Sequence, residues 1–197
     1  MRGLIIAVLA AALGCGAGSR SGSPAPSPSA DLEALYRARM DSARMRFTPA
    51  DVRFMSGMIG HHHQALEMAR LARANGAAPV IETLAARVIN AQRDEIATMQ
   101  QWLRERELPL PEGHMHMPGM LSPAQMQELA AARGRAFDRL FLQYMIQHHR
   151  GAVAMVHELF GADGAAQDEV VFKLASDIQV DQITEIARME LMLEEMP

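Results

Sequence analysis

Cysteine and aromatic residues are both scarce in this chain of 197 residues. One cysteine cannot form an internal disulfide, so a disulfide framework and a cysteine-rich zinc site are both excluded. Aromatic residues make up only 5% of the chain, whereas strands are usually rich in aromatic and β-branched residues. The net charge is −4, from 19 basic and 23 acidic residues, which gives no electrostatic case for binding nucleic acid.

The chain is rich instead in methionine and histidine, with 16 Met and 8 His. Hydrophobic residues form 49% and charged residues 21%, so the length suits about one folded domain with a core. Ala, Leu, Met, Arg, Glu and Gln dominate the composition, and these residue types favour helices. We therefore predict an all-α fold.

The first 15 residues have the form of an export signal. One basic residue precedes an apolar run over residues 4–13, which as a helix would span about 15 Å, half of a bilayer core. The sequence Ala12-Leu13-Gly14-Cys15 resembles a bacterial lipoprotein signal, with Cys15 as the lipidated residue. We predict a lipid-anchored protein of the bacterial cell envelope, in the periplasm or on the outer face of a membrane. The alternative is ordinary cleavage near residues 10–12.

Residues 16–30 form a Gly/Ser/Pro tract that has nothing to bury and is typical of a flexible linker. Apolar residues at helical spacing then predict a short leading helix over residues 31–47 and an antiparallel four-helix bundle over residues 48–197. Capping residues, prolines and glycines divide the bundle into long helices over about 49–74, 79–106, 135–160 and 167–195, a loop over 107–121 and a short helix after Ser122.

The bundle sequence repeats itself once. Met58-Ile59-Gly60-His61-His62-His63-Gln64-Ala65 recurs as Met145-Ile146-Gln147-His148-His149-Arg150-Gly151-Ala152, and residues 92–99 recur as residues 182–189. The first copy covers about residues 48–106 and the second about residues 122–197. We therefore expect two related helical hairpins, stacked with pseudo-twofold symmetry.

Polar residues interrupt the apolar faces of all four long helices at matching positions. Burying such groups costs free energy unless they are hydrogen-bonded, paired or bound to metal. The predicted metal ligands are Met58, His61, His62, Met145, His148 and His149. Residues that could orient these ligands or add further donors are Met55, Gln92, Glu95, Met99, Gln182, Glu185 and Met189. The loop between the copies could form a mobile metal site from His114, Met115, His116, Met117 and Met120.

The spacing of these residues favours copper over iron. Di-iron bundles use Glu-x-x-His, whereas Met58-x-x-His61 and Met145-x-x-His148 put a thioether in place of the carboxylate. Thioethers favour Cu(I), and imidazole binds copper in either oxidation state, so we expect Cu(I) first and Cu(II) second. The two glutamates of the partner helices then suit a role in orienting imidazoles better than a role as ligands.

Both halves of the chain resemble a bacterial family called domain of unknown function 305. The segments FMSGMIGHHHQALEMA and FDRLFLQYMIQHHRGAVAM, each followed by a helix with Q-x-x-E-I-x-x-M, carry the resemblance, together with residues 117–126 between them. It covers about residues 48–195. The resemblance implies a ferritin-like four-helix bundle, an exported location and, for some members, copper binding linked to metal tolerance.

These observations together predict a non-catalytic, membrane-tethered protein that sequesters copper ions or passes them on. The sequence leaves open a second copy of the chain or a copper-transfer protein as its partner. Two other functions also stay open. A ferritin-like metal-dependent oxidase would fit the bundle and the histidines, although carboxylates for iron are few. A helical interaction module would use the histidines as ordinary core residues.

Overall fold

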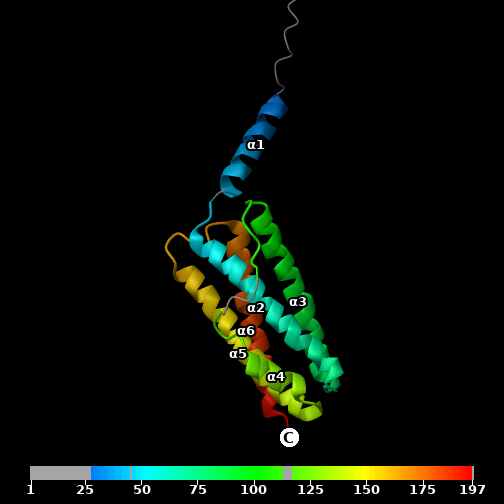
Figure 1. Ribbon diagram of the computed structural model, residues 1–197. Coiled ribbons are helices and arrows are strands. Elements are labelled where there is room, and N and C mark those ends of the chain that lie inside the picture. Colours follow the sequence, from blue (N-terminus) through cyan, green and yellow to red (C-terminus); the bar gives the residue numbers. More distant parts are fainter. Residues whose placement is uncertain (1–27, 45, 113–116, 197) are drawn as a thin grey trace, which may run out of the picture. The chain divides into compact units, whose positions relative to one another are not determined.

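The computed structural model describes residues 28–44, 46–112 and 117–196 (Figure 1). These ranges hold six helices and no strand, which confirms the predicted all-α fold. The helices are α1 (Pro28–Arg44), α2 (Pro49–Ala74), α3 (Pro79–Arg104), α4 (Pro123–Ala131), α5 (Gly134–Gly161) and α6 (Glu169–Glu194). The predicted signal with Cys15 and most of the predicted linker lie outside the described residues.

The helix α1 covers most of the predicted leading helix. It begins at Pro28, within the stretch that we predicted as linker, because proline suits the first turn of a helix, where its missing N–H is not needed. An ion pair between Arg37 and Glu33, with a nitrogen–oxygen distance of 3.1 Å, lies along its surface. None of the helices in the described ranges has the length and apolar character needed to cross a bilayer.

Capping side chains set where the bundle helices begin. The Thr48 hydroxyl accepts a hydrogen bond from the Asp51 N–H at 3.2 Å, and the Asp51 carboxylate accepts one from the Thr48 N–H at 2.7 Å. Ser122 and Gln125 cap α4 in the same reciprocal way. Asp168 caps α6 by accepting hydrogen bonds from the first free N–H groups of that helix. Helices α3 and α5 begin without a side-chain cap, and all four long helices begin and end within two residues of their predicted bounds.

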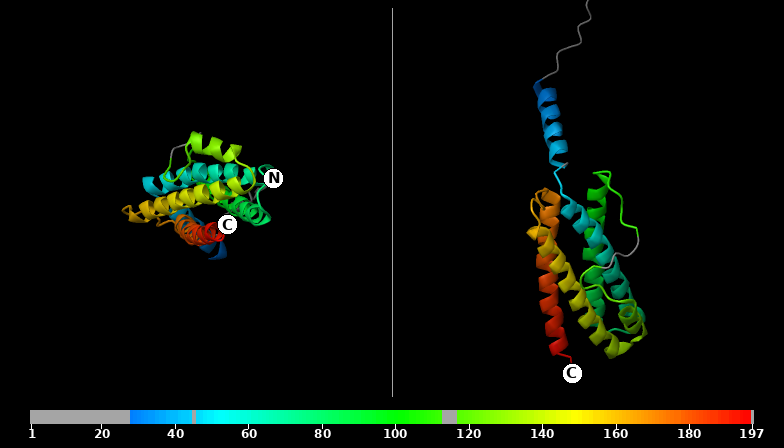
Figure 2. Two further views of the ribbon diagram at one scale, coloured as in Figure 1. Left: turned by 90° about the horizontal axis from the view of Figure 1, so that it is seen from below. Right: turned by 60° about the vertical axis from the view of Figure 1, so that its left-hand side comes forward.

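The four long helices form a bundle of two hairpins. Helix α2 packs against α3 and helix α5 against α6, and the contact between α2 and α5 joins the hairpins. Seen from below, α4 lies on one side of α2 and α5, while α3 and α6 lie on the other (Figure 2, left). The matching helices α2 and α5 of the two sequence copies therefore meet along the middle of the bundle.

Two apolar clusters fill the core of the bundle. On α5, buried residues before His148 belong to one cluster and buried residues after His149 belong to the other. Helix α3 divides in the same way around Gln92 and Glu95, and α6 around Gln182. The polar residues that interrupt the apolar faces therefore lie in a layer between two hydrophobic halves.

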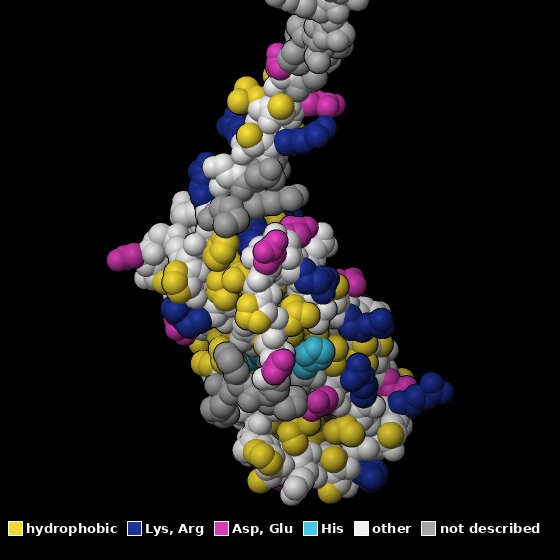
Figure 3. Space-filling model, turned by 45° about the horizontal axis from the view of Figure 1, so that its top comes forward, with side chains coloured by type: hydrophobic (Ala, Val, Ile, Leu, Met, Phe, Trp, Pro, Cys, Tyr) yellow, Lys and Arg dark blue, Asp and Glu magenta, His cyan; other side chains and the backbone are white. Residues whose placement is uncertain are grey.

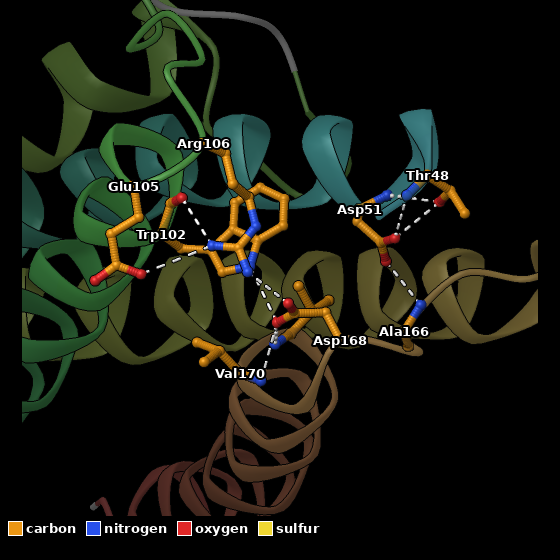
Figure 4. A network of polar contacts seen from close by, with 9 residues as sticks. Thr48, Asp51, Trp102, Glu105, Arg106, Ala166, Asp168 and Val170 are labelled. Carbon is orange, nitrogen blue, oxygen red and sulfur yellow. Dashed lines mark hydrogen bonds and ion pairs between the residues drawn. The ribbon is translucent and has the colours of Figure 1, made fainter. Parts of the chain in front are cut away.

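A polar network closes one end of the bundle (Figure 4). The Arg106 guanidinium donates to the Asp168 carboxylate at 2.5 Å and lies over the Trp102 ring, 4.3 Å from its centroid. Trp102 also donates its indole N–H to Asp168 at 3.0 Å. Because Arg106 follows α3 and Asp168 caps α6, this buried group ties the two hairpins together.

Repeated aspartates hold matching loops at the two ends. Asp51 in α2 accepts a hydrogen bond from the Ala166 N–H at 2.7 Å, in the loop before α6. Its counterpart Asp138 in α5 accepts from the Ala78 N–H at 3.2 Å, in the loop before α3. Burial raises the pKa of the Asp138 carboxyl above its usual value of 3.8. Each copy thus uses the same residue to join the start of its first helix to the connecting loop of the other hairpin.

Candidate metal centre

Four histidines lie fully buried in the middle of α2 and α5: His61, His62, His148 and His149. His61 and His148, which occupy matching positions in the two copies, lie ring against ring with their centroids 3.8 Å apart. The neighbouring rings on each helix, His61 with His62 and His148 with His149, have centroids 6.3 Å apart. The contact between α2 and α5 therefore brings histidines of both copies into one layer, which we call the histidine layer.

The two histidines at the centre of this layer donate hydrogen bonds to backbone carbonyls. Nε2 of His61 lies 3.0 Å from the carbonyl oxygen of Pro118, and Nε2 of His148 lies 3.0 Å from the carbonyl oxygen of His61. A carbonyl oxygen can only accept a hydrogen bond, so Nε2 must carry the proton in both rings. The tautomer of each central imidazole is therefore set by its surroundings.

The two outer histidines are hydrogen-bonded to carboxylates in a symmetric way. Nε2 of His62 lies 2.7 Å from Glu95 Oε2 on α3, and Nε2 of His149 lies 2.6 Å from Glu185 Oε2 on α6. An ionised carboxylate accepts, so these rings also carry their proton on Nε2 when they are neutral. The predicted orienting glutamates are therefore both bonded to the histidines of their own hairpin.

The other ring nitrogen, Nδ1, is buried in all four histidines and has no hydrogen-bond partner among the described residues. When Nε2 carries the proton of a neutral imidazole, Nδ1 presents a lone pair. Most buried polar atoms in proteins are hydrogen-bonded, so four such atoms in one layer require an explanation. Metal-binding histidines typically donate their second N–H to a carboxylate or a backbone carbonyl, as these four do.

Burial keeps the two central imidazoles neutral. The pKa of His61 is lowered from 6.5 to about 3. Loss of solvation is the main cause, and the nearby His62 contributes to the same shift. Loss of solvation also lowers the pKa of His148 well below 6.5, with added repulsion from His61 and His149. Their lone pairs therefore stay free of protons in mildly acidic solution.

We expect the metal-free protein to lose stability as the pH falls below 6.5. Below that value the unfolded chain binds protons at His61 and His148 that the folded chain does not bind, so protonation favours unfolding. At 1.4 kcal/mol per pH unit, His61 alone should cost about 2 kcal/mol by about pH 5, and His148 adds to this loss. Urea unfolding at about pH 7 and about pH 5 measures the effect.

The control for this pH dependence is the double variant His61→Gln, His148→Gln. It keeps the carboxyl groups, so the difference between the two proteins isolates the two histidines. Equal pH dependence in the wild type and the double variant would show that these rings do not resist protonation in the folded state.

Two buried amides lie one helical turn from the glutamates. Gln92 on α3 is 2% exposed, and neither atom of its amide group has a hydrogen-bond partner among the described residues. Gln182, its counterpart on α6, is 3% exposed and has an unpartnered amide oxygen. These amides occupy matching positions in the two copies, so the unsatisfied polar groups follow the repeat.

The thioether donors predicted on the four long helices are all buried but lie in two groups. Met55, Met58 and Met99 belong to one apolar cluster, and Met145 and Met189 belong to the other. All five side chains have zero exposure. Soft donors therefore lie on both sides of the histidine layer.

Within the described residues, no three His, Cys, Asp or Glu side chains are arranged to hold one ion. The four imidazoles therefore do not form a ready-made four-nitrogen site. An ion in the histidine layer would be bound by one or two imidazoles and would complete its coordination with other donors, such as thioether sulfur. That mixture of ligands suits copper better than it suits a hard ion.

The hydrogen bond from His61 to Pro118 was missed from the sequence. It depends on a tight turn at Gly119, which has φ of +77°, and on the close approach of this turn to α5. A Cβ atom on Gly151 would overlap the Pro118 carbonyl group. Gly151 therefore lets the turn come close enough for Pro118 to bond with His61.

The matching position of the first copy holds the same segment from the other side. Gln64, the counterpart of Gly151, accepts a hydrogen bond from the Leu121 N–H at 2.7 Å and donates one to the Leu121 carbonyl at 3.0 Å. The sequence signal that could have revealed this contact is the difference between Gln64 and Gly151 at matching positions. The two residues differ because the single segment that connects the hairpins packs against both.

The described part of the predicted mobile metal site is a packed turn. Met120 is 8% exposed, and its sulfur accepts a hydrogen bond from the Met117 N–H at 3.4 Å. These two residues thus pack in a turn that lies between α2 and α5, and a metal site there stays a prediction. His114, Met115 and His116 lie outside the described residues.

Comparison with known proteins places this site in a family. Residues 51–193 match the family model described as "Domain of unknown function (DUF305)", which is well over half of the chain. The chain belongs to the DUF305 family. A search of curated proteins finds no significant match.

Solved structures of DUF305 proteins resemble this chain over most of its length. A Streptomyces coelicolor DUF305 protein, whose description assigns it to secreted proteins, is 30% identical with a TM-score of 0.68, covering 74% of this chain and 93% of its own. A DUF305 fragment from Deinococcus radiodurans is 32% identical with a TM-score of 0.68, covering 75% and 97%. CopM in its Cu(I)-bound form is 31% identical with a TM-score of 0.61, covering 73% and 95%. CopM was also solved in Cu(II)-bound and Ag-bound forms.

Proposed function

We propose that this DUF305 protein is a non-catalytic copper-binding protein of the bacterial cell envelope, which sequesters copper ions or passes them on. The observation that carries the proposal is the histidine layer, in which four buried Nδ1 atoms lack partners while each Nε2 bonds to an oxygen. The similarity to CopM, which was solved with Cu(I), Cu(II) and Ag, supports copper as the ion.

The proposed ligands combine imidazole and thioether groups. They are Met58, His61, His62, Met145, His148 and His149. Thioether sulfur favours Cu(I), and the imidazoles also accommodate Cu(II). Glu95 and Glu185 orient the outer histidines and make them more basic, which strengthens their bonds to a metal.

A non-catalytic role is favoured over an oxidase because of what the carboxylates do. Di-iron oxidases bind their metals with several glutamates and two histidines. Here Glu95 and Glu185 are hydrogen-bonded to Nε2 atoms of His62 and His149. We further propose that α2, α3, α5 and α6 form a ferritin-like arrangement, since two matching hairpins join through α2 and α5.

The face of the protein shown in Figure 3 carries acidic and basic side chains interspersed with hydrophobic ones. Such a face concentrates no strong field of one sign, and it offers little attraction to a polyanion. The proposal therefore has a metal ion and a membrane as partners and no nucleic acid. A second copy or a copper acceptor protein is compatible with the same proposal.

Equilibrium dialysis against competing copper chelators tests copper binding. The full chain, purified in mild detergent, is compared with a variant in which His61, His62, His148 and His149 are alanine. We expect the wild type to keep both Cu(I) and Cu(II) at chelator concentrations that strip the variant. The matched control replaces the exposed His63 and His157 and should keep its copper. Equal loss from the wild type and the four-histidine variant, with helical circular dichroism intact, would refute the proposal.

We expect the substitution Cys15→Ala to release the protein from the membrane fraction. Lipid attached to this cysteine is the proposed anchor, and the apolar clusters of the bundle use residues from Phe47 onward, so folding should not change. Cell fractionation with an antibody to the bundle measures the location, and the melting temperature checks the fold. A Cys15→Ala protein that stays in the membrane fraction would contradict the lipid anchor.

A further inference from the structure

Two methionine side chains meet over Gly57 of α2, outside the histidine layer. A Cβ atom placed on Gly57 would lie 2.5 Å from the Cε of Met117 and 3.4 Å from the Cε of Met155. The Met117 sulfur would lie 3.3 Å from the same point. The methyl ends of Met117 and Met155 therefore converge where Gly57 leaves room for them. Met155 was not among the ligands predicted from the sequence.

These methionines line an open pocket of about 260 Å³ between the start of α2 and the end of α5. Its other walls include the apolar side chains of Phe54 and Leu159. One basic residue, Arg53, and one acidic residue, Glu158, also line it. Met117 and the nearly buried Met155 therefore line this pocket in largely apolar surroundings, with one residue of each charge.

The pocket is adjacent to the histidine layer along the chain. Gly57 lies about one helical turn before His61 on α2. Met117 is directly followed by Pro118, whose carbonyl accepts the hydrogen bond from His61 at 3.0 Å. An ion held by the two methionines would therefore lie close to the outer edge of the histidine layer.

We propose that Met117 and Met155 form a second site, which binds a monovalent soft cation such as Cu(I) and supplies it to the histidine layer. The proposal rests on copper as the cargo of this protein. Thioethers select soft ions, whereas an apolar pocket with neutral donors cannot replace the water of a hard divalent ion. Two protein ligands and an open side leave the ion free to exchange, as a transfer site requires. The ion keeps its oxidation state throughout.

Silver nitrate is the probe for this site, because Ag(I) is soft and monovalent and stays in one oxidation state. The full chain in detergent micelles carries ¹³C-methyl methionine, and NMR follows each methyl group during the titration. The variants Met117→Leu and Met155→Leu assign the two signals and test their coupling. Met68→Leu is the matched control, since Met68 is buried in the other apolar cluster.

We expect the Met117 and Met155 methyl signals to shift together, with one dissociation constant. Each leucine variant should weaken the silver response of the remaining methionine at least 10-fold, and Met68→Leu should leave both responses unchanged. The proposal is overturned if Met155 does not shift, or if Met155→Leu leaves the silver affinity at Met117 unchanged. If the protein retains copper in dialysis but the Met117 and Met155 methyl signals do not shift with silver, this second site alone is overturned. Loss of both copper and silver binding would overturn the proposed function as well.

Discussion

Replacing His61 and His62 with alanine is expected to weaken copper binding almost as much as replacing all four buried histidines. The reason is the contact between the two copies, in which the rings of His61 and His148 lie with centroids 3.8 Å apart. An ion bound in this layer would draw ligands from both α2 and α5, so either pair is needed for full affinity. Ligands that act as one unit give strongly non-additive effects.

The same result is expected for the other pair, His148 and His149. Each double substitution should lower copper affinity by more than the 10- to 100-fold that loss of an orienting group typically costs. Competition with a chromogenic chelator measures the affinity, and elemental analysis measures the number of ions bound. The two copies would bind copper independently if each double variant lost half of the copper ions and bound the other half with full affinity.

Replacing Glu95 with glutamine is a matched variant for interpreting these results. It keeps the size of the side chain and its oxygen acceptor but removes the charge that bonds to Nε2 of His62. Its effect on copper affinity should be smaller than that of losing the His61 and His62 pair, because the glutamate orients a ligand and does not bind the ion. An equal effect would make Glu95 itself a ligand.

Helix positions and the pairing of the two copies could be predicted from the sequence. Local signals such as Thr48 with Asp51, and the prolines that start α2 and α3, set the helix bounds independently of tertiary structure. The repeated M-I-x-H-H pattern, set on a helical wheel, places His61 and His148 on equivalent inward faces. Packing two such helices together then brings their histidines into contact.

The hydrogen-bond partners of the histidines could be predicted only where the repeat showed them. Glu95 and Glu185 recur at matching positions of the partner helices, and each bonds to the outer histidine of its own hairpin. Pro118 lies in a connecting segment that has no second copy, and its approach to His61 depends on the path of that segment over Gly151. Neither propensity nor periodicity specifies such a path, because the path depends on contacts between residues far apart in the chain.

The convergence of Met117 and Met155 was hidden for the same reason. No sequence pattern assigned a role to Met155, and composition grouped Met117 with the neighbouring histidines of the connecting loop. Only the packing of that loop on α2 shows that the methyl ends of both side chains reach Gly57. Sequence patterns therefore indicated which donor types the chain carries and left open which of them meet.

The largest loss of stability is expected from Asp168→Ala, at the end of the bundle away from the histidine layer. This substitution removes the nearer carboxylate partner of the Arg106 guanidinium, which is 2% exposed, and leaves only the longer contact with Glu105 at 3.9 Å. It also removes the acceptor of the Trp102 indole N–H and the cap of α6. Breaking a buried ion pair by removing one partner typically costs about 3–5 kcal/mol of unfolding free energy, and urea unfolding measures the loss.

Two further variants test whether the lost stability comes from the buried Arg106–Asp168 pair or from removing any charged residue. Glu190→Gln breaks the exposed pair between Arg150 and Glu190, whose nitrogen–oxygen distance is 2.6 Å, and should change the unfolding free energy by less than about 1 kcal/mol. The double variant Arg106→Leu, Asp168→Leu should lose less stability than Asp168→Ala, because it leaves no unpaired charge among the apolar residues. If the double variant is instead the least stable of the three, packing and capping, and not the unpaired guanidinium, determine the cost of losing Asp168.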